Sequence, residues 1–251
     1  MIIVFGILAY AVFNQSKIAE QNQVWAGLTK ETAHQLGTPI ASLMAWIDYL
    51  KNSPVWEENK EVIQEMDKDV IKLRMVTERF SSIGSKPVIV SENVFKVVDD
   101  AITYLRPRIS SKVEMNVNGY ARDIEAMINK PLFEWVIENI CKNAVDAMKG
   151  QGKISIDIVK ESEQYVIVDI TDNGRGMEKN MYKKVFNPGF STRKRGWGLG
   201  LTLAKRIIEG YHQGKVFVKT SEVGKGTTFR IVLNGVKEQM DEKTKENFFS
   251  F

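Results

Sequence analysis

Amide, carboxylate and glycine residues gather in four short clusters in the second half of the chain. In the first, ENICKNA, Asn139 and Asn143 are four residues apart, so on a helix they share one face. Amide oxygens on a common face can bind a hydrated Mg²⁺ ion, helped by phosphate oxygens. Taken alone, this cluster is more simply interpreted as the polar face of a helix.

The second cluster, DNGRGM, directly follows the apolar stretch YVIVDIT. Asp172 ends the predicted strand, where its carboxylate can accept a hydrogen bond from an exocyclic amine. Gly174 and Gly176 let the backbone approach a flat ligand or turn sharply. A plain Asn-Gly turn explains the same residues equally well, so this cluster alone decides nothing.

The third cluster, GWGLGL at residues 196–201, leads into a predicted helix. Glycine-spaced N–H groups at a helix N-terminus can bind an anion. The cluster follows a polar loop and not a strand, so it is not a dinucleotide-binding fingerprint. That loop, residues 187–195, contains STRKR and is interpreted as a mobile cover for phosphate groups. The fourth cluster, GKGTTF at residues 224–229, is a glycine turn before the last predicted strand.

A histidine lies in the first part of the chain, within a helical apolar pattern. This residue, His34, is followed five positions later by Pro39 in the same pattern. A proline inside a helix removes a backbone hydrogen bond and costs about 3 kcal/mol, so we expect a bend or a weak point there. By itself, a lone histidine on a helix is more often structural or solvated than catalytic.

Composition restricts the classes of function. A length of 251 residues predicts one or two domains. The net charge of +4 is spread along the chain, mildly favours anionic ligands or a membrane surface, and is too small to indicate nucleic-acid binding. The single Cys141 excludes an internal disulfide and is typical of a reducing compartment. One cysteine and two distant histidines also argue against a zinc centre.

Two long helices are predicted over residues 14–50 and 55–83, where apolar residues repeat every seven positions in two rows. The turn KNSP makes them an antiparallel hairpin. One hairpin leaves an apolar seam uncovered, so two copies are expected to form a four-helix bundle, a homodimer. The first row is Ala19, Ala26, Ala33, Ile40 and Ile47, then Ile63, Val70 and Thr77; the second is Thr29, Leu36, Leu43 and Leu50, then Met66, Leu73 and Phe80.

Residues 1–13 are almost wholly apolar. They are fewer than the roughly 20 residues that span a bilayer, and they lack the basic region and cleavage site of a signal peptide. The pattern continues unbroken into the helix that follows. We interpret the segment as the cytoplasmic end of a transmembrane helix with more sequence upstream; a buried helix start is the alternative.

A linker at residues 84–90 precedes a second domain, predicted over residues 91–234, and a tail at 235–251 without a recognisable motif. Ser91 and Pro131 are the expected N-cap and first-turn residues of two helices. The order of elements indicates an α+β sandwich, a mixed sheet with helices on one face. Strands are predicted at 88–90, 113–117, 124–128, 153–160, 165–171, 216–220 and 227–233, and helices at 91–106, 131–148 and 199–211.

The four clusters, in this order, resemble the N, G1, G2 and G3 boxes of the ATPase superfamily shared by histidine kinases, gyrase, heat-shock chaperones and mismatch-repair proteins. VFNPGF resembles the F box, and AHQLGTPI resembles the H box of sensor histidine kinases of two-component systems. The resemblance covers residues 15–233. It implies a dimeric helical hairpin followed by an ATP-binding sandwich, in a protein of the bacterial inner membrane whose catalytic core faces the cytoplasm.

The resemblance also implies autophosphorylation with ATP and Mg²⁺, followed by transfer to an aspartate in the receiver domain of a response regulator. His34 would accept the γ-phosphoryl group, and Thr38 would orient a water if the kinase also acts as a phosphatase on that partner. Asn143, supported by Asn139, would bind Mg²⁺, and Asp172 would bind the adenine amine. The other implied nucleotide-binding residues are Gly174, Gly176, Arg193, Lys194, Gly196, Gly198, Gly200 and Thr228.

Three residues qualify this expectation. Gln35 stands where the family usually has Glu or Asp beside the phosphohistidine, and a neutral amide is a very poor base, so autophosphorylation is slow or another group takes the proton. Gly37 stands where the family often has a basic residue, and with Pro39 it predicts a locally soft helix. Asn139 stands where ATP-hydrolysing members carry Glu to activate water, which favours transfer over hydrolysis.

Two alternatives stay open. Gln35 also fits a dimeric scaffold that binds a response regulator and uses nucleotide only as a conformational ligand. The second alternative is a gyrase- or chaperone-like ATPase, against which Asn139 and the upstream hairpin argue.

Overall fold

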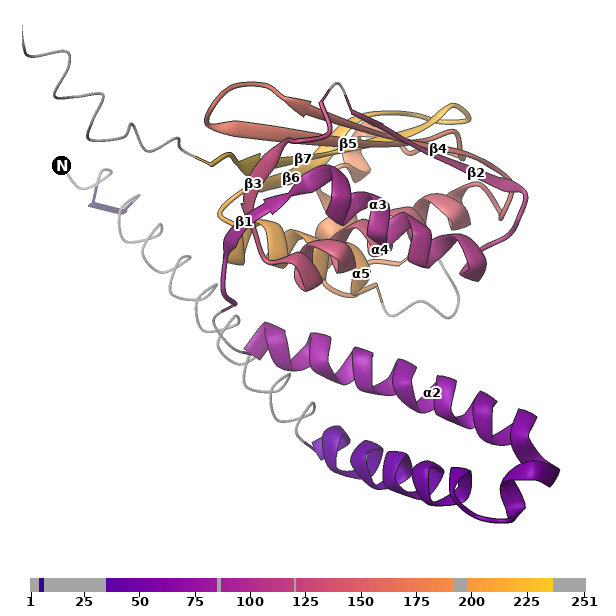
Figure 1. Cartoon of the computed structure of the whole chain (residues 1–251). Helices are drawn as coiled ribbons and strands as arrows, with labels where there is room; N and C mark the ends of the chain where they lie inside the picture. The colour runs from indigo at the N-terminus through magenta and orange to yellow at the C-terminus, as the bar shows by residue number, and fades with distance from the viewer. Residues whose placement is uncertain (1–4, 7–34, 85–86, 120, 192–197, 237–251) are drawn as a thin grey trace, which may run out of the picture. The chain divides into compact units, whose positions relative to one another are not determined.

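The structure is a computed structural model, and it describes residues 5–6, 35–84, 87–119, 121–191 and 198–236 (Figure 1). The chain divides into two compact units, Met1–Pro87 and Val88–Phe251. His34 lies outside the described residues, as do the tail beyond residue 236 and all of the segment 1–13 except Phe5 and Gly6. In the part of the chain that the structure describes, no helix is long and apolar enough to cross a membrane.

The first unit contains an antiparallel helical hairpin, made of a helix over residues 35–51 and α2 (Val55–Gly84). The turn is closed at Ser53, whose N–H and hydroxyl donate to the Leu50 carbonyl at 3.2 and 2.9 Å. Across the hairpin, Lys51 Nζ lies 2.6 Å from Asp67 Oδ2.

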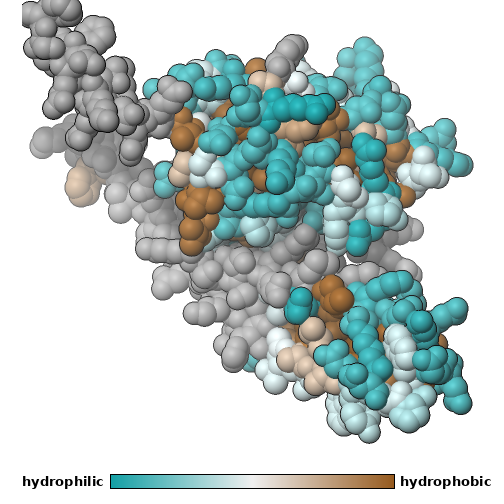
Figure 2. All heavy atoms as spheres, viewed as in Figure 1, coloured by the Kyte–Doolittle hydropathy of each residue, from teal (hydrophilic) through white to brown (hydrophobic). Residues whose placement is uncertain are grey.

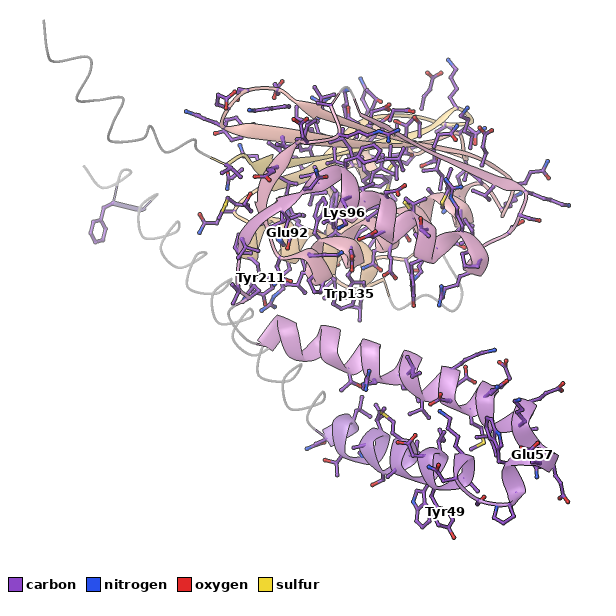
Figure 3. The ribbon with its side chains drawn as sticks, in the orientation of Figure 1. Tyr49, Glu57, Glu92, Lys96, Trp135 and Tyr211 are labelled. Carbon is purple, nitrogen blue, oxygen red and sulfur yellow. The ribbon has the colours of Figure 1, made fainter. Side chains whose placement is uncertain are left out.

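The first heptad row closes this hairpin, whereas most of the described residues of the second row stay open to solvent. The buried residues are Ile40, Ile47, Ile63 and Val70, with Met44, Leu50 and Trp56 packed against them. The side chains of Leu36, Leu43, Met66 and Leu73 are between 42% and 51% exposed. Tyr49 is also exposed and projects away from α2 (Figure 3). The hairpin therefore presents an apolar face that its own helices do not cover.

The second unit is a two-layer α+β sandwich, which confirms the predicted fold class. Its five-stranded sheet has the order β2-β4-β5-β7-β6, in which β2 is parallel to β4 and the other neighbours are antiparallel. A separate ribbon pairs β1 with β3. Helices lie on one side of the sheet (Figure 1). The elements are β1 (Val90–Asn93), α3 (Val94–Leu105), η1 (Arg106–Arg108), β2 (Val113–Gly119), β3 (Glu125–Ile128), α4 (Lys130–Ala147), β4 (Gly152–Lys160), β5 (Tyr165–Asp172), η2 (Lys179–Met181), η3 (Lys184–Phe186), α5 (Gly200–Lys205), η4 (Arg206–Tyr211), β6 (Lys215–Glu222) and β7 (Gly226–Asn234).

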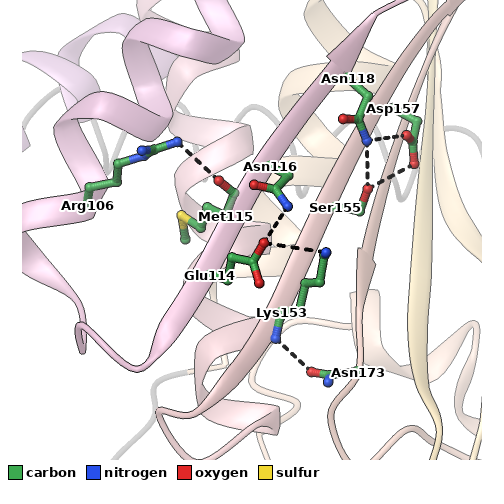
Figure 4. Close-up of polar contacts among 9 residues, drawn as sticks. All are labelled: Arg106, Glu114, Met115, Asn116, Asn118, Lys153, Ser155, Asp157 and Asn173. Atoms are coloured by element: carbon green, nitrogen blue, oxygen red, sulfur yellow. Dashed lines mark hydrogen bonds and ion pairs between the residues drawn. The ribbon is translucent and has the colours of Figure 1, made fainter.

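Alternation along the strands separates an apolar face under the helices from a polar open face. On β4 the isoleucines at every second position are fully buried, whereas Ser155 and Asp157 bond to Asn118 of β2 at 3.1 and 2.9 Å (Figure 4). The face of this unit seen in Figure 2 is mostly hydrophilic. The buried isoleucines of β4 are Ile154, Ile156 and Ile158.

The predicted N-terminus of α3 is wrong by two residues. The N-cap is Asn93, whose Oδ1 accepts from Lys96 N at 2.8 Å. Ser91, the expected cap, lies in β1, which begins at Val90, and its hydroxyl donates to Glu125 Oε2 at 2.7 Å. Both residue types cap helices well. The choice between them depends on pairing with β3, which lies more than thirty residues away in sequence.

Candidate functional site

Helix α4 brings Asn139 and Asn143 to its partly exposed side. Its first turn is held by Asn129, whose Oδ1 accepts from Leu132 N at 3.2 Å, and by Pro131, at a position where proline is tolerated. Much of the rest of the helix is buried in the core. The fully buried residues of α4 are Leu132, Phe133, Val136, Ile137, Ile140 and Cys141.

The Asn139 amide is buried on one side and lacks a partner there. Among the described residues, its Nδ2 is the buried side-chain polar atom without a hydrogen bond. Gly200, the first residue of α5, packs against the same amide: a Cβ on Gly200 would lie 3.3 Å from Asn139 Oδ1. An unpaired buried donor costs roughly 1–3 kcal/mol, which a bound acceptor such as a phosphate oxygen would recover.

Asp172 ends β5 and is 4% exposed. Its Oδ1 accepts from Gly174 N at 2.8 Å, and the Thr227 N–H also bonds its carboxylate. Burial raises the pKa of Asp172 above its ordinary value, although both backbone hydrogen bonds oppose this shift. A buried carboxylate held only by backbone N–H groups retains acceptor capacity for a ligand amine.

The loop after β5 lies so close to neighbouring backbone that two positions require glycine. Gly176 has a φ of +63°, and a Cβ there would collide with the Glu222 carbonyl. Gly226, at φ +115°, would collide in the same way with the Asp172 carbonyl. The loop is also bonded to its surroundings, since Arg175 N donates to the Ala147 carbonyl at 3.1 Å. Glycine at these positions lets the loop pack beside Asp172.

The structure does not place the Thr228 side chain on the same face of the sheet as Asp172. Thr228 pairs with Thr171 across the β5–β7 ladder, and their hydroxyls lie 3.0 Å apart on the open face. The preceding residue, Thr227, pairs with Asp172 and is buried on the helix side. Sequence reasoning missed Thr227 because the two threonines are adjacent in GKGTTF, and only the strand register decides which one shares a face with Asp172.

The remaining predicted site residues fall into two groups. Arg193 and Lys194 of the loop before the third cluster, and Gly196 of that cluster, lie outside the described residues, as does His34. Gly198 is described and packs against the backbone of Gly189 and Phe190.

Near the predicted acceptor, Gln35 and Thr38 are exposed on the helix over residues 35–51, which is helical through Gly37 and Pro39. The expected softness of that turn stays a prediction.

The second histidine, His212, has a structural role that the sequence did not suggest. It is 3% exposed; its Nδ1 donates to the Ile207 carbonyl at 2.9 Å, and its Nε2 accepts from Asn129 N at 2.9 Å. This pairing requires the neutral ring, and burial lowers the pKa of His212. The His212 N–H also bonds Ile207, five residues back, so the helix predicted over 199–211 ends as a π-helix.

Cys141 has no accessible thiol chemistry. Burial, with a smaller contribution from Glu138, raises the pKa of its thiol to about 12. Glu138 is itself only 2% exposed and is paired with Lys142 at 3.0 Å. These neighbours of Asn139 therefore belong to the packing of α4.

The donor set on α4 fits Mg²⁺ bound mainly through water and nucleotide oxygens. Two amides one helical turn apart supply neutral oxygen ligands, as Mg²⁺ prefers when phosphates complete its shell. Among the described residues, no group of three or more His, Cys, Asp and Glu could hold a metal by itself. Asn143 and Asn139 are the residues that would hold the ion.

Residues 129–236 match the family model described as histidine kinase-, DNA gyrase B-, and HSP90-like ATPase. The chain is 29% identical to sporulation kinase E of Bacillus subtilis, over 85% of this chain and 29% of the relative. It is 28% identical to the sensor histidine kinase ZraS of Salmonella typhimurium, over 92% of this chain and 49% of the relative. The chain therefore spans less than half the length of these curated relatives.

Solved structures show the same fold. Full-length ShkA in complex with AMPPNP superimposes with a TM-score of 0.62 at 16% identity, covering 84% of this chain and 46% of that one. The histidine kinase ThkA in complex with the response regulator TrrA gives a TM-score of 0.56 at 20% identity, covering 92% of this chain and 67% of that one.

Proposed function

We propose that this chain is an ATP-dependent protein-histidine kinase. Its residues 129–236 match the histidine kinase-, DNA gyrase B-, and HSP90-like ATPase family model, and most of its length is similar to sensor histidine kinases. The γ-phosphoryl group of ATP would pass to His34, and from there to an aspartate of a response regulator. The relatives support the kinase family, and the complex of ThkA with TrrA supports a response regulator as partner.

The arrangement around Asn139 is the main support for the first part of this proposal, the binding of ATP. Its buried Nδ2 lacks a protein acceptor, and Gly200 leaves space beside its Oδ1. A phosphate oxygen of ATP would satisfy the amide nitrogen, and Mg²⁺, when bound to Asn143 and Asn139, would neutralise the phosphate charge. Asp172 would accept the hydrogen bond of the adenine amine.

The chemistry of these residues favours transfer over hydrolysis. Phosphoryl transfer asks the protein mainly for positioning and charge neutralisation. Asn139 stands where hydrolysing relatives have Glu, and an amide cannot remove a proton from water. The γ-phosphoryl group would therefore be kept for His34.

The second part of the proposal, phosphoryl transfer to His34, depends on the adjacent residue Gln35. Gln35 can orient the imidazole by a hydrogen bond, but it cannot serve as its base. We expect a slow autophosphorylation rate that Gln35→Glu raises. An unchanged rate and an unchanged pH–rate profile in this variant would show that Gln35 does not limit proton removal.

The second heptad row supports a homodimer. Four exposed apolar side chains along one hairpin match the seam of a four-helix bundle. We propose that a second copy covers this face, and that the response regulator approaches the exposed turn near Gln35 and Thr38. A membrane anchor upstream stays part of the proposal.

Incubation of the chain with γ-labelled ATP and Mg²⁺ tests this function. The expected product is protein-bound phosphate that is lost in acid and is absent from His34→Ala. Steady release of free phosphate without phosphoprotein would instead support the ATPase alternative. Nucleotide binding with neither product would support the scaffold, the alternative that Gln35 favours.

A further inference from the structure

A network of hydroxyl and amide groups lies beside Asp172 and joins the loop after β5 to β6 and β7. Ser221 of β6 is its centre. Its Oγ accepts from Met177 N at 2.9 Å, donates to the Gly226 carbonyl at 3.0 Å and lies 2.9 Å from Thr227 Oγ1. Thr227 in turn pairs with Asp172 in the sheet. A single residue, Thr227, therefore lies between the Ser221 hydroxyl and Asp172.

Tyr182 holds Ser221 in place through the main chain. The Tyr182 hydroxyl donates to the Ser221 carbonyl and accepts from the Ser221 N–H, both at 2.6 Å. β6 is an edge strand, so these backbone groups have no strand partner on that side. With its backbone anchored on one side and paired with β7 on the other, Ser221 presents its hydroxyl to Thr227 in a fixed position.

The hydrogens in the network follow from counting donors and acceptors. A serine hydroxyl has one hydrogen to donate and two lone pairs that accept. The Met177 N–H can only donate, and the Gly226 carbonyl can only accept. Ser221 therefore gives its hydrogen to Gly226 and uses one lone pair for Met177. Its second lone pair can only receive, so Thr227 Oγ1 donates its hydrogen to Ser221.

We propose that Ser221 is a specificity-determining residue that makes the groups beside Asp172 pure hydrogen-bond acceptors. With its hydrogen committed to Ser221, Thr227 Oγ1 can only accept, as can the ionised Asp172 carboxylate. Two adjacent acceptors fit the exocyclic amine of adenine and oppose the carbonyl at the same position of guanine. The inference rests on the proposed binding of ATP and identifies a residue that strengthens the discrimination against GTP already exerted by Asp172.

Equilibrium binding of ATP and of GTP to the full chain, each with Mg²⁺, tests this assignment. Wild type is expected to prefer ATP. In Ser221→Ala the Thr227 hydroxyl is free to rotate and donate to the guanine carbonyl, so the ATP-to-GTP affinity ratio falls about tenfold, mainly through tighter GTP binding. A merely structural role would weaken both nucleotides alike. An unchanged ratio in a folded Ser221→Ala would overturn the proposal.

Matched variants make the result decisive. Ser221→Thr keeps a hydroxyl and should keep the wild-type ratio, as should Ser155→Ala, which removes a hydroxyl from the open face of the same sheet. If Ser221→Ala does not fold by circular dichroism, the nearly isosteric Ser221→Cys, a weak hydrogen-bonding group, replaces it under the same criterion. Absence of ATP binding by wild type refutes the proposed function; ATP binding with an unaltered ratio refutes this inference alone.

Discussion

Two aspartates on β5 show how the position of a residue sets its chemistry. Asp172 faces the helices, where burial raises its pKa. Asp169, three residues earlier, faces the open side; burial opposes its ionisation, but hydrogen bonds from Arg230 and Lys219 outweigh this and lower its pKa. The Arg230 guanidinium bonds both carboxylate oxygens at 2.7 Å. Asp169 is thus fully engaged within the protein, whereas Asp172 keeps acceptor capacity for a ligand.

Replacement of Asp172 by Asn should weaken ATP binding by at least about tenfold, because an amide loses the charge-assisted hydrogen bond to the adenine amine. ATP affinity of wild type should also fall on acidification at a higher pH than for an aspartate with the ordinary pKa of 3.8. Titration calorimetry checks both results. Asp169→Asn is the matched control: it should lower stability and leave ATP affinity unchanged. Equal affinities for wild type and Asp172→Asn would refute the role.

His212 predicts a loss of stability in mild acid. Its folded-state pKa is depressed below the ordinary 6.5, so the unfolded chain binds the proton first. The stability that the neutral ring contributes is present above about pH 6.5 and is lost as pH falls through the lower folded-state pKa. Urea unfolding should therefore show lower stability at about pH 5.5 than at about pH 7.5.

The control for this prediction is His212→Gln, which keeps a donor and an acceptor but does not titrate in this range. It should be less stable than wild type near neutral pH, and its stability should depend less on pH over the same interval. An identical pH dependence in the variant would assign the effect to other groups.

At the scale of elements, the contact between α4 and the start of α5 couples the two clusters that would hold the phosphates. Gly200 begins α5 directly against the Asn139 amide. Two residues further along α5, the Thr202 hydroxyl donates to the Phe186 carbonyl at 3.1 Å, and the Phe186 ring packs edge-on against Phe229. α5 therefore contacts the core on one side and, on the other, the Asn139 amide that would bind the nucleotide.

Gly200→Ala should reduce ATP affinity severalfold without loss of stability. The added Cβ, 3.3 Å from Asn139 Oδ1, displaces the amide, whereas alanine has a higher helix propensity than glycine. Paired measurements of ATP binding and of urea unfolding check the two effects. Gly210→Ala is the control, since a Cβ there meets only Arg206 Cγ at 3.9 Å. Equal affinities in the two variants would exclude the contact as a determinant of binding.

At the scale of the molecule, the two units differ in how completely they bury their apolar residues. The second unit buries its apolar residues between sheet and helices. Among the described residues, the hairpin buries one heptad row and leaves most of the other exposed, and apolar rows of this kind mark interaction surfaces. A second hairpin of the same sequence offers the matching row, so self-association is the simplest way to cover it.

Leu43→Glu should convert the proposed dimer into a monomer, because it places a charge in the centre of the exposed row. Light scattering after size-exclusion chromatography measures this directly. Val88→Glu, which charges an exposed valine of the second unit, should leave the oligomeric state unchanged. A monomeric wild type would refute the dimer, whatever the result for the variants.

The sequence by itself determined the helical hairpin, the α+β sandwich and the identity of the clusters on its helices and turns. These features depend on local spacing: heptad repeats, alternation along strands, and glycines before helices and strands. Helix α4 and the strand that ends at Asp172 needed no distant information.

Only the tertiary structure decided which of two similar residues, close together in sequence, takes a given role or is buried. It selected Thr227 over Thr228 through the register of β7, and Asn93 over Ser91 through the pairing of β1 with β3. It also decided that Ile47 is buried while Leu43 is not. In each case the competing residues have nearly the same local propensity, so contacts with segments distant in sequence make the choice.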